Sequence, residues 1–204
     1  MNIKNGLLYG VCAAAVLGAS VASANVLTFQ NVTFTTTALS PNELQLTIDN
    51  ATSANGDWTG VNYLNALAMT SSAAQWSFTS VSVSSTPSGS ATYLAGGLSA
   101  SGTNGCNGSG TGWFCFSWSP KLSLTNNMVF DFTFAGAPVS GEDFSLPHLK
   151  LSFYTNATDD RKTGSLLSMD IPPGGTTVPE PGSLALMAAG LFGLGWFVRR
   201  RRLS

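Results

Sequence analysis

The chain has 204 residues, of which 9% are charged and 44% hydrophobic, and its formal net charge is −1. Five of its nine basic residues lie within residues 1–24 and 179–204, so residues 25–177 hold four basic and nine acidic residues, a net charge of −5. An acidic segment of this length without a basic cluster argues against a nucleic-acid-binding protein.

Residues 1–24 have the organisation of a secretory signal peptide. Lys4 supplies the positive charge, residues 7–19 form a short apolar region, and Ala22-Ser23-Ala24 is a small-residue cleavage site. We expect cleavage after Ala24, with an uncleaved membrane anchor as the alternative. Cys12 lies inside the apolar region and not at the cleavage site, so a lipoprotein signal is not indicated.

Residues 25–171 are predicted to form one all-β domain, an antiparallel β-sandwich or jelly roll. Eight or nine short segments, separated by Pro, Gly, Asn and Asp, alternate apolar with polar residues. Two antiparallel sheets, each buried on one side, produce this pattern when they pack face to face. The expected strands are residues 25–37, 43–49, 75–84, 113–118, 128–134, 148–154 and 164–171, while 61–69 fits a strand or a short helical turn.

Two irregularities modify this pattern. The alternation slips by one residue between Phe29 and Val32, which predicts a β-bulge within the first strand. Residues 86–112 form a long segment rich in Ser and Gly, which leads into the loop between the two cysteines, and no strand is expected in it. Residues 172–178 are rich in Pro, Gly and Thr and predict a linker that separates the domain from the rest of the chain.

Cys106 and Cys115 are predicted to form a disulfide. They are close in sequence, the intervening Asn-Gly-Ser-Gly-Thr-Gly favours a turn, and an exported chain enters an oxidising compartment. The spacing is too wide for a C-x-x-C redox site, and no histidine lies nearby to complete a metal site. A loop this small would stabilise the fold by about 2–3 kcal/mol.

No catalytic constellation is evident, and we expect a protein that is not an enzyme. The single histidine, His148, lies on the polar face of its strand and is interpreted as a solvated residue. A Ser-His-Asp site would need an activated serine beside it, and no G-x-S-x-G turn nominates one.

The acidic pairs Glu142-Asp143 and Asp159-Asp160 lie in turn-like sequences and are interpreted as solubilising charges. They would have to meet across a cleft to act as a hydrolase pair. No cofactor is predicted; weak Ca²⁺ binding by Asp159, Asp160 and Asn156 is the alternative, without any recognised calcium-loop spacing in support.

Two tryptophans are candidates for stacking on sugar rings, as in carbohydrate-binding modules. Trp58 lies in the polar segment Gly-Asp-Trp-Thr-Gly, and Trp113 lies on the opposite strand face from Phe114. The alternative is that Trp58 closes one end of the sandwich and that Trp113 packs on the disulfide.

The end of the sequence combines three features in a fixed order. Pro179-Glu180-Pro181 is followed by an uncharged apolar run over residues 184–198. Arg199, Arg200, Arg201 and Arg202 come directly after the run. A 15-residue helix spans only about 22 Å of a roughly 30 Å hydrocarbon core, so the run predicts a marginal transmembrane helix with a cytoplasmic arginine end.

This order resembles a PEP-CTERM sorting signal, found on exported proteins of Gram-negative bacteria that make extracellular polysaccharide. The resemblance implies recognition of Pro179, Glu180 and Pro181 by an exosortase, a membrane protease-transpeptidase that cleaves nearby. It also implies that the helix is a transient inner-membrane anchor and that the arginines are a stop-transfer element. The expected protein is exported and not an enzyme, and it resides at the cell surface or in the matrix. The alternatives are a carbohydrate-binding module of that matrix or, more remotely, a hydrolase.

Overall fold

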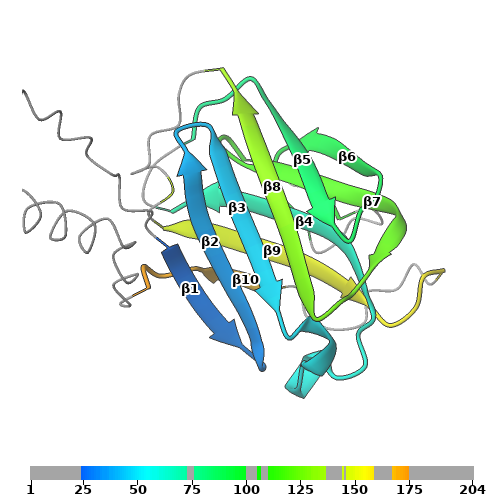
Figure 1. The fold of residues 1–204 in the computed structure, drawn as a ribbon. Coiled ribbons are helices and arrows are strands. Elements are labelled where there is room, and N and C mark those ends of the chain that lie inside the picture. The colour runs from blue at the N-terminus through cyan, green and yellow to red at the C-terminus, as the bar shows by residue number, and fades with distance from the viewer. Residues whose placement is uncertain are drawn as a thin grey trace, which may run out of the picture.

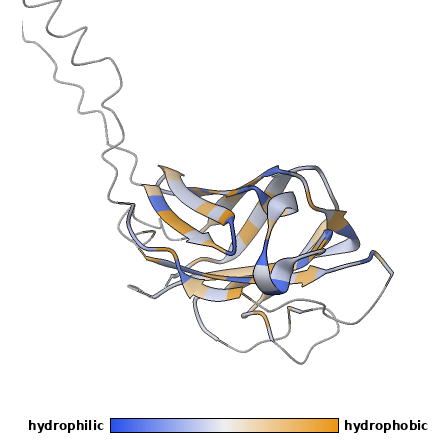
Figure 2. Ribbon diagram, turned by 90° about the horizontal axis from the view of Figure 1, so that it is seen from below, coloured by the Kyte–Doolittle hydropathy of each residue, from blue (hydrophilic) through white to orange (hydrophobic). Residues whose placement is uncertain are grey.

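The computed structural model describes residues 24–72, 76–99, 105–106, 110–136, 144, 146–158 and 167–174. They form two five-stranded antiparallel sheets, which confirms the predicted all-β class (Figure 1). The strands of one sheet cross behind those of the other, and the alternating hydropathy along them is visible when the layers are viewed edge-on (Figure 2).

The first sheet, sheet A, has the strand order β1-β2-β3-β8-β5. Strands β1, β2 and β3 form two consecutive hairpins. Strand β8 pairs with β3, and β5 pairs with β8. Their bounds are Ala24–Phe29, Val32–Ser40, Glu43–Asp49, Asn127–Ala135 and Ser80–Thr86 for β1, β2, β3, β8 and β5.

The second sheet, sheet B, has the strand order β10-β9-β4-β7-β6, so β10 and β6 are its edges. Two short 3-10 helices, η1 (Ala51–Ser53) and η2 (Gly56–Trp58), connect β3 with β4. The strand bounds are Leu167–Asp170, Pro147–Tyr154, Tyr63–Ser71, Phe114–Ser123 and Ala91–Ala95 for β10, β9, β4, β7 and β6.

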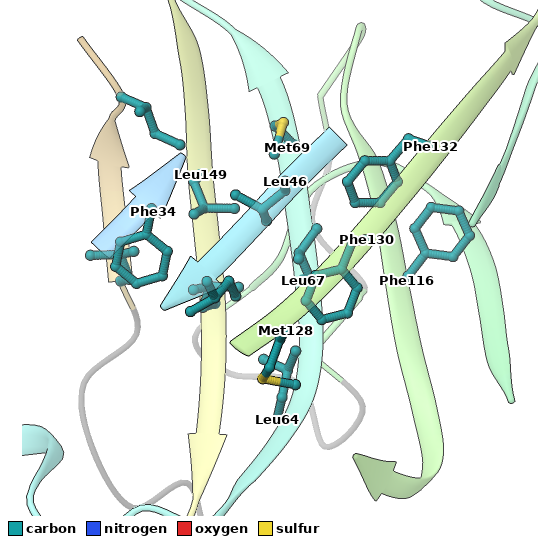
Figure 3. Packing of buried hydrophobic residues seen from close by; sticks show 14 of the residues in the cluster. Phe34, Leu46, Leu64, Leu67, Met69, Phe116, Met128, Phe130, Phe132 and Leu149 are labelled. Carbon is teal, nitrogen blue, oxygen red and sulfur yellow. The ribbon is translucent and has the colours of Figure 1, made fainter. Parts of the chain in front are cut away.

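The hydrophobic core lies between the inner faces of the sheets (Figure 3). The ring of Phe132 in sheet A packs 5.0 Å from that of Phe114 and 5.9 Å from that of Phe116, both in sheet B. Full burial of one such side chain contributes about 1.5–3 kcal/mol. The inward residues are those that the alternation predicted, among them Leu44, Leu46, Ile48, Phe130, Phe132, Leu149 and Leu151.

The predicted bulge between Phe29 and Val32 is instead a hairpin turn. Gln30 and Asn31 both have positive φ, 49° and 68°, and Phe29 pairs with Val32 across the turn. Two consecutive positive-φ residues give the type I′ geometry that a two-residue hairpin requires. The expected strand 25–37 is therefore two strands, β1 and β2.

Three further segments differ from expectation. The ambiguous segment 61–69 is strand β4, with a register shift between Leu64 and Ala66. The expected strand 75–84 is shorter at its start, because β5 begins only at Ser80, after Trp76 and Phe78. The Ser/Gly-rich segment 86–112 contains strand β6, which was not expected.

The edges of the two sheets meet where β1 begins and β10 has ended. The Val26 N–H donates to the Pro172 carbonyl at 3.0 Å, and the Gly174 N–H donates to the Ala24 carbonyl at 3.0 Å. Asn25 between them is 3% exposed, and its Nδ2 donates to the Phe144 carbonyl at 2.7 Å. Residues 172–174 thus pack on the domain, although they were expected to belong to the linker.

Candidate functional site

The outer face of sheet B carries the principal group of chemically versatile side chains. Strand β9 presents His148 and Lys150 on this face, and β10 presents Ser168 and Asp170. The register places Asp170 opposite His148 and Ser168 opposite Lys150. Residues two apart on a strand share a face, so the four side chains form a square on adjacent strands.

His148 is hydrogen-bonded through both ring nitrogens. Its Nδ1 lies 2.6 Å from Asp170 Oδ1, and its Nε2 lies 3.0 Å from Ser168 Oγ. The side chains of His148 and Asp170 are 24% and 47% exposed. A carboxylate only accepts hydrogen bonds, so the Nδ1 that faces Asp170 carries a proton, and in the corresponding tautomer the Nε2 lone pair faces the serine hydroxyl.

Two neighbours, Ser72 and Trp113, complete this group. Ser72 Oγ lies 3.0 Å from Asp170 Oδ1, and the Trp113 ring lies 5.5 Å from the imidazole in a T-shaped arrangement. Lys150 Nζ lies 4.5 Å from the Trp113 ring centroid. We call the six residues the His148 cluster: Ser72, Trp113, His148, Lys150, Ser168 and Asp170.

Sequence reasoning interpreted His148 as a solvated strand residue and found no serine beside it. The structure places Ser168 there. The sequence does contain Ser168-Met169-Asp170 within an expected strand, and this spacing places the serine and aspartate side chains on one face. Only the pairing of β10 with β9 brings that face to His148.

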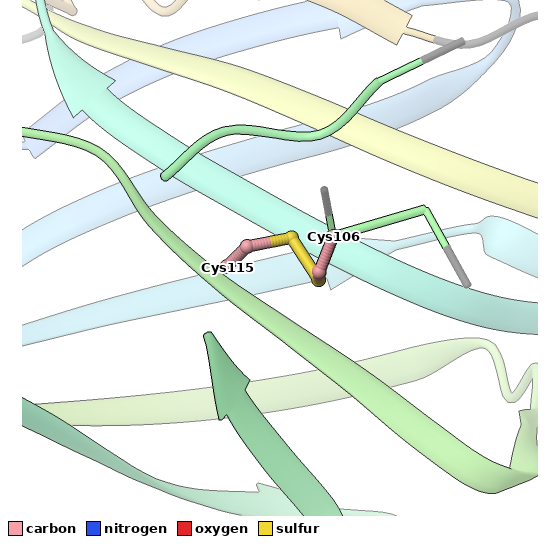
Figure 4. Close-up of a disulfide and its surroundings, with 2 residues drawn as sticks. All are labelled: Cys106 and Cys115. Atoms are coloured by element: carbon pink, nitrogen blue, oxygen red, sulfur yellow. A yellow bond between two sulfur atoms is a disulfide. The ribbon is translucent and has the colours of Figure 1, made fainter. Parts of the chain in front are cut away.

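The predicted disulfide is present on the same outer face (Figure 4). Cys115 lies in β7, and both half-cystines are buried against Ala66, Ala68 and Leu98, with Trp113 packed on them. Gly105, with φ of 77°, lies so close that a Cβ there would be 2.9 Å from Ala66 Cβ. The disulfide thus fastens the chain near Cys106 onto the small residues of β4.

Neither tryptophan offers an open ring. Trp58 is 1% exposed, with its ring 4.9 Å from that of Phe153 and 5.3 Å from that of Phe29, so it closes an end of the core. Trp113 is partly buried, and Lys150 Nζ lies over its ring. A Cβ on Gly97 would be 3.3 Å from the indole, so backbone also packs closely on it. Trp58 thus closes one end of the sandwich and Trp113 packs on the disulfide, as the alternative to sugar stacking predicted.

The predicted acidic sites are largely outside the described residues, which include none of Glu142, Asp143, Asp159 or Asp160. Asn156 is described, and its Oδ1 accepts from the Thr158 N–H at 3.0 Å within its own turn. The described ranges contain no group of three or more His, Cys, Asp or Glu residues able to hold a metal ion.

The predicted sorting residues also lie outside the described residues: Ala22, Pro179, Glu180, Pro181 and Arg199, Arg200, Arg201, Arg202. So does the predicted helix over 184–198. Among the residues that are described, no helix is long and apolar enough to cross a membrane. Ala24, the residue before the predicted signal cleavage, is the first residue of β1.

Comparison with known proteins assigns the tail. The family model of the PEP-CTERM protein-sorting motif matches residues 177–202, a segment that includes Pro-Glu-Pro, the apolar run and the arginines. No curated protein and no solved structure matches the chain significantly. The sorting motif is processed by exosortase, a membrane protease, and is consistent with an exported, membrane-anchored precursor. The end of the chain thus carries a PEP-CTERM protein-sorting motif.

Proposed function

We propose that the protein is a surface or matrix component whose precursor is held in the inner membrane by its tail and released by an exosortase. The observation that carries this proposal is the sorting motif over residues 177–202. The disulfide supports it, because such bonds form in the oxidising compartments that an exported chain enters. This role requires no catalysis by the β domain.

The geometry of the domain ends suggests an order of events. The predicted cleavage bond, Ala24–Asn25, lies within β1, where Ala24 is paired with Thr37 and Asn25 is buried. A peptidase needs an accessible, extended substrate, so signal cleavage would precede the docking of β1. Docking also needs Pro172, so the domain closes only after the chain has been exported to that point.

The tail would then be anchored close to the folded domain. Four residues lie between Gly174 and Pro179, which makes five Cα–Cα steps from one to the other. Fully extended, they reach at most about 17 Å. An exosortase would therefore act next to the edge where β1 meets Pro172–Gly174, and the domain would remain near the membrane until release.

The proposal is tested by replacing Pro179, Glu180 and Pro181 with alanine together in the producing cell. We expect the variant to accumulate in the membrane fraction at the mass of the uncleaved tail, as wild-type protein would in cells without the exosortase. Thr176→Ala, outside the matched segment, is the matched control and should be released normally. Normal release of the triple variant would contradict the proposal.

A further inference from the structure

We infer that Ser168, His148 and Asp170 form a nucleophilic site for acyl transfer, with small acyl esters as its substrate class. This inference goes beyond the proposed sorting function and does not depend on it. It reopens the expectation that the protein is not an enzyme, because that expectation was based on finding no serine beside His148.

The first argument is the direction of the hydrogen bonds. Asp170 faces Nδ1 at 2.6 Å and Ser168 faces Nε2 at 3.0 Å, so each residue is at the nitrogen that its role requires. The carboxylate holds the proton on Nδ1 and leaves Nε2 as the base for the Ser168 hydroxyl. Serine hydrolases on unrelated folds share this arrangement, which is identified by geometry and not by sequence order.

The second argument is the support of the carboxylate. Ser72 Oγ lies 3.0 Å from Asp170 Oδ1 and 2.9 Å from the Leu146 carbonyl, and its single hydroxyl hydrogen is shared between these two acceptors. The chain just after β4 thus helps to position the acid, and the Trp113 ring packs 5.5 Å from the imidazole in a T-shaped arrangement. Groups that orient the base in this way restrict it to one ring position.

The third argument concerns a donor for the developing oxyanion. The Ile171 N–H donates to the Pro147 carbonyl at 2.8 Å, so the N–H groups of Ile171 and Met169 point toward β9. By the alternation of an antiparallel pair, the N–H groups of Ser168 and Asp170 point away from β9, and β10 is an edge strand of sheet B among the residues that the structure describes. The backbone donor next to Oγ is therefore directed away from β9, where an ester carbonyl oxygen could accept from it.

The reaction proceeds in two balanced steps. Ser168 Oγ attacks the ester carbonyl carbon while Nε2 takes its proton. The carbon–oxygen bond to the alcohol then breaks, and the alcohol leaves with that proton. Water next attacks the acyl-serine and gives a proton to Nε2. The bond from Oγ to the acyl carbon breaks, Oγ regains the proton, and a carboxylic acid is released.

The exposure of the site defines the substrate class. Ser168 and Asp170 are exposed on a sheet surface, so the site can reach a small acyl ester displayed on an extended polymer but does not surround it. Catalysis gains from excluding water, and an exposed site forgoes that gain. We therefore expect readily detected acylation of Ser168 with slow turnover.

The test is covalent labelling of the full-length chain, purified in detergent micelles, with a fluorophosphonate. In this reaction Ser168 Oγ replaces fluoride on phosphorus and loses its proton to Nε2. Tandem mass spectrometry should find the label on Ser168, and His148→Ala or the near-isosteric His148→Gln should slow labelling by about 100-fold or more. Ser80→Ala, which removes an exposed serine of the other sheet, should change nothing.

Asp170 is a positioning residue for the His148 ring. Its test distinguishes loss of this positioning from loss of the fold. Asp170→Asn should slow labelling, whereas Asp170→Glu should restore part of the rate, with both variants melting close to wild type. Absence of label on Ser168 would overturn the inference. So would equal labelling rates in wild type and a folded His148 variant, because an ordinary surface bridge between β9 and β10 would give that result.

Discussion

At the scale of single residues, Trp58 shows how a polar sequence can hold a core side chain. Its neighbours Asp57 and Thr59 are exposed, yet its ring contacts Phe29, Phe34 and Phe153. The Trp58 N–H donates to Gln30 Oε1 at 3.1 Å, so the hairpin turn fixes the loop that delivers the ring. Gln30 and Trp58 both lie outside the strands, so the alternation of polar and apolar residues could not predict that Trp58 is buried.

We predict that Trp58→Ala lowers the free energy of unfolding by about 3–5 kcal/mol, because it leaves a cavity among three aromatic rings. Denaturant unfolding of the disulfide-intact protein measures the change. Trp113→Ala is the comparison and should cost less, since its ring is only partly buried. A loss below 1 kcal/mol at Trp58 would show that the ring is not a core residue.

Trp113 makes a second prediction, about ligands. Stacking on a sugar needs an open ring face, and Lys150 Nζ and Gly97 both pack on the indole. We expect Trp113→Ala to leave retention of the mature protein by extracellular polysaccharide unchanged in a sedimentation assay. Loss of retention, with the melting temperature preserved, would revive the carbohydrate-binding alternative.

At the scale of elements, the strands with strongly apolar faces could be predicted from the sequence. Strand β3 was expected at its observed bounds, and β8 within one residue of them at each end, because Leu, Ile and Phe alternate with polar residues. Strand β6 was missed because its sequence, Ala-Thr-Tyr-Leu-Ala, lies among Ser and Gly. The turn at Gln30-Asn31 was missed because neither residue is Gly, the usual marker of a type I′ turn.

The His148 cluster could not be predicted for a different reason. Its members come from β9, β10 and the segments flanking β4 and β7, and its hydrogen bonds depend on the register of β10 against β9. A shift of one residue would turn Ser168 and Asp170 to the inner face. Register depends on both paired strands, so the sequence of β10 alone does not show which residues of β9 lie opposite Ser168 and Asp170.

The disulfide supplies the prediction at this scale. Replacing Cys106 and Cys115 together with serine should lower the free energy of unfolding by about 2–3 kcal/mol, because the loop between them is short. Thermal melting of the double variant, compared with wild type before and after reduction, measures this. Reduction should destabilise wild type only. Unfolding of the whole domain at room temperature on reduction would contradict the prediction, since the main core lies on the other face of sheet B.

At the scale of the whole molecule, the domain ends are adjacent. The Gly174 N–H donates to the Ala24 carbonyl, so the first and last residues of the described domain lie side by side. The predicted export signal precedes this point in the chain, and the sorting motif follows it. The sequence predicted both signals but not their proximity, because β1 and residues 172–174 are about 145 residues apart and meet only through the closed sandwich.

This arrangement predicts that the distance between the domain and the sorting motif matters. Deleting residues 175–177 leaves Pro179 within about two residues of the folded edge, a reach of roughly 7 Å. We expect release to slow because the protease would collide with the domain. Replacing the same residues with Gly-Ser-Gly preserves the length and is the control. Equal release of both variants, followed by immunoblotting of the medium, would argue against crowding.

The most direct measurement is intact-mass spectrometry of the released protein from cells with and without the exosortase. Exosortase-competent cells should release protein that begins at Asn25 and lacks residues 184–204, whereas cells without the enzyme should retain those residues in a membrane-bound form. Released protein that still contains residues 184–204, or identical masses in both cells, would contradict sorting through the tail.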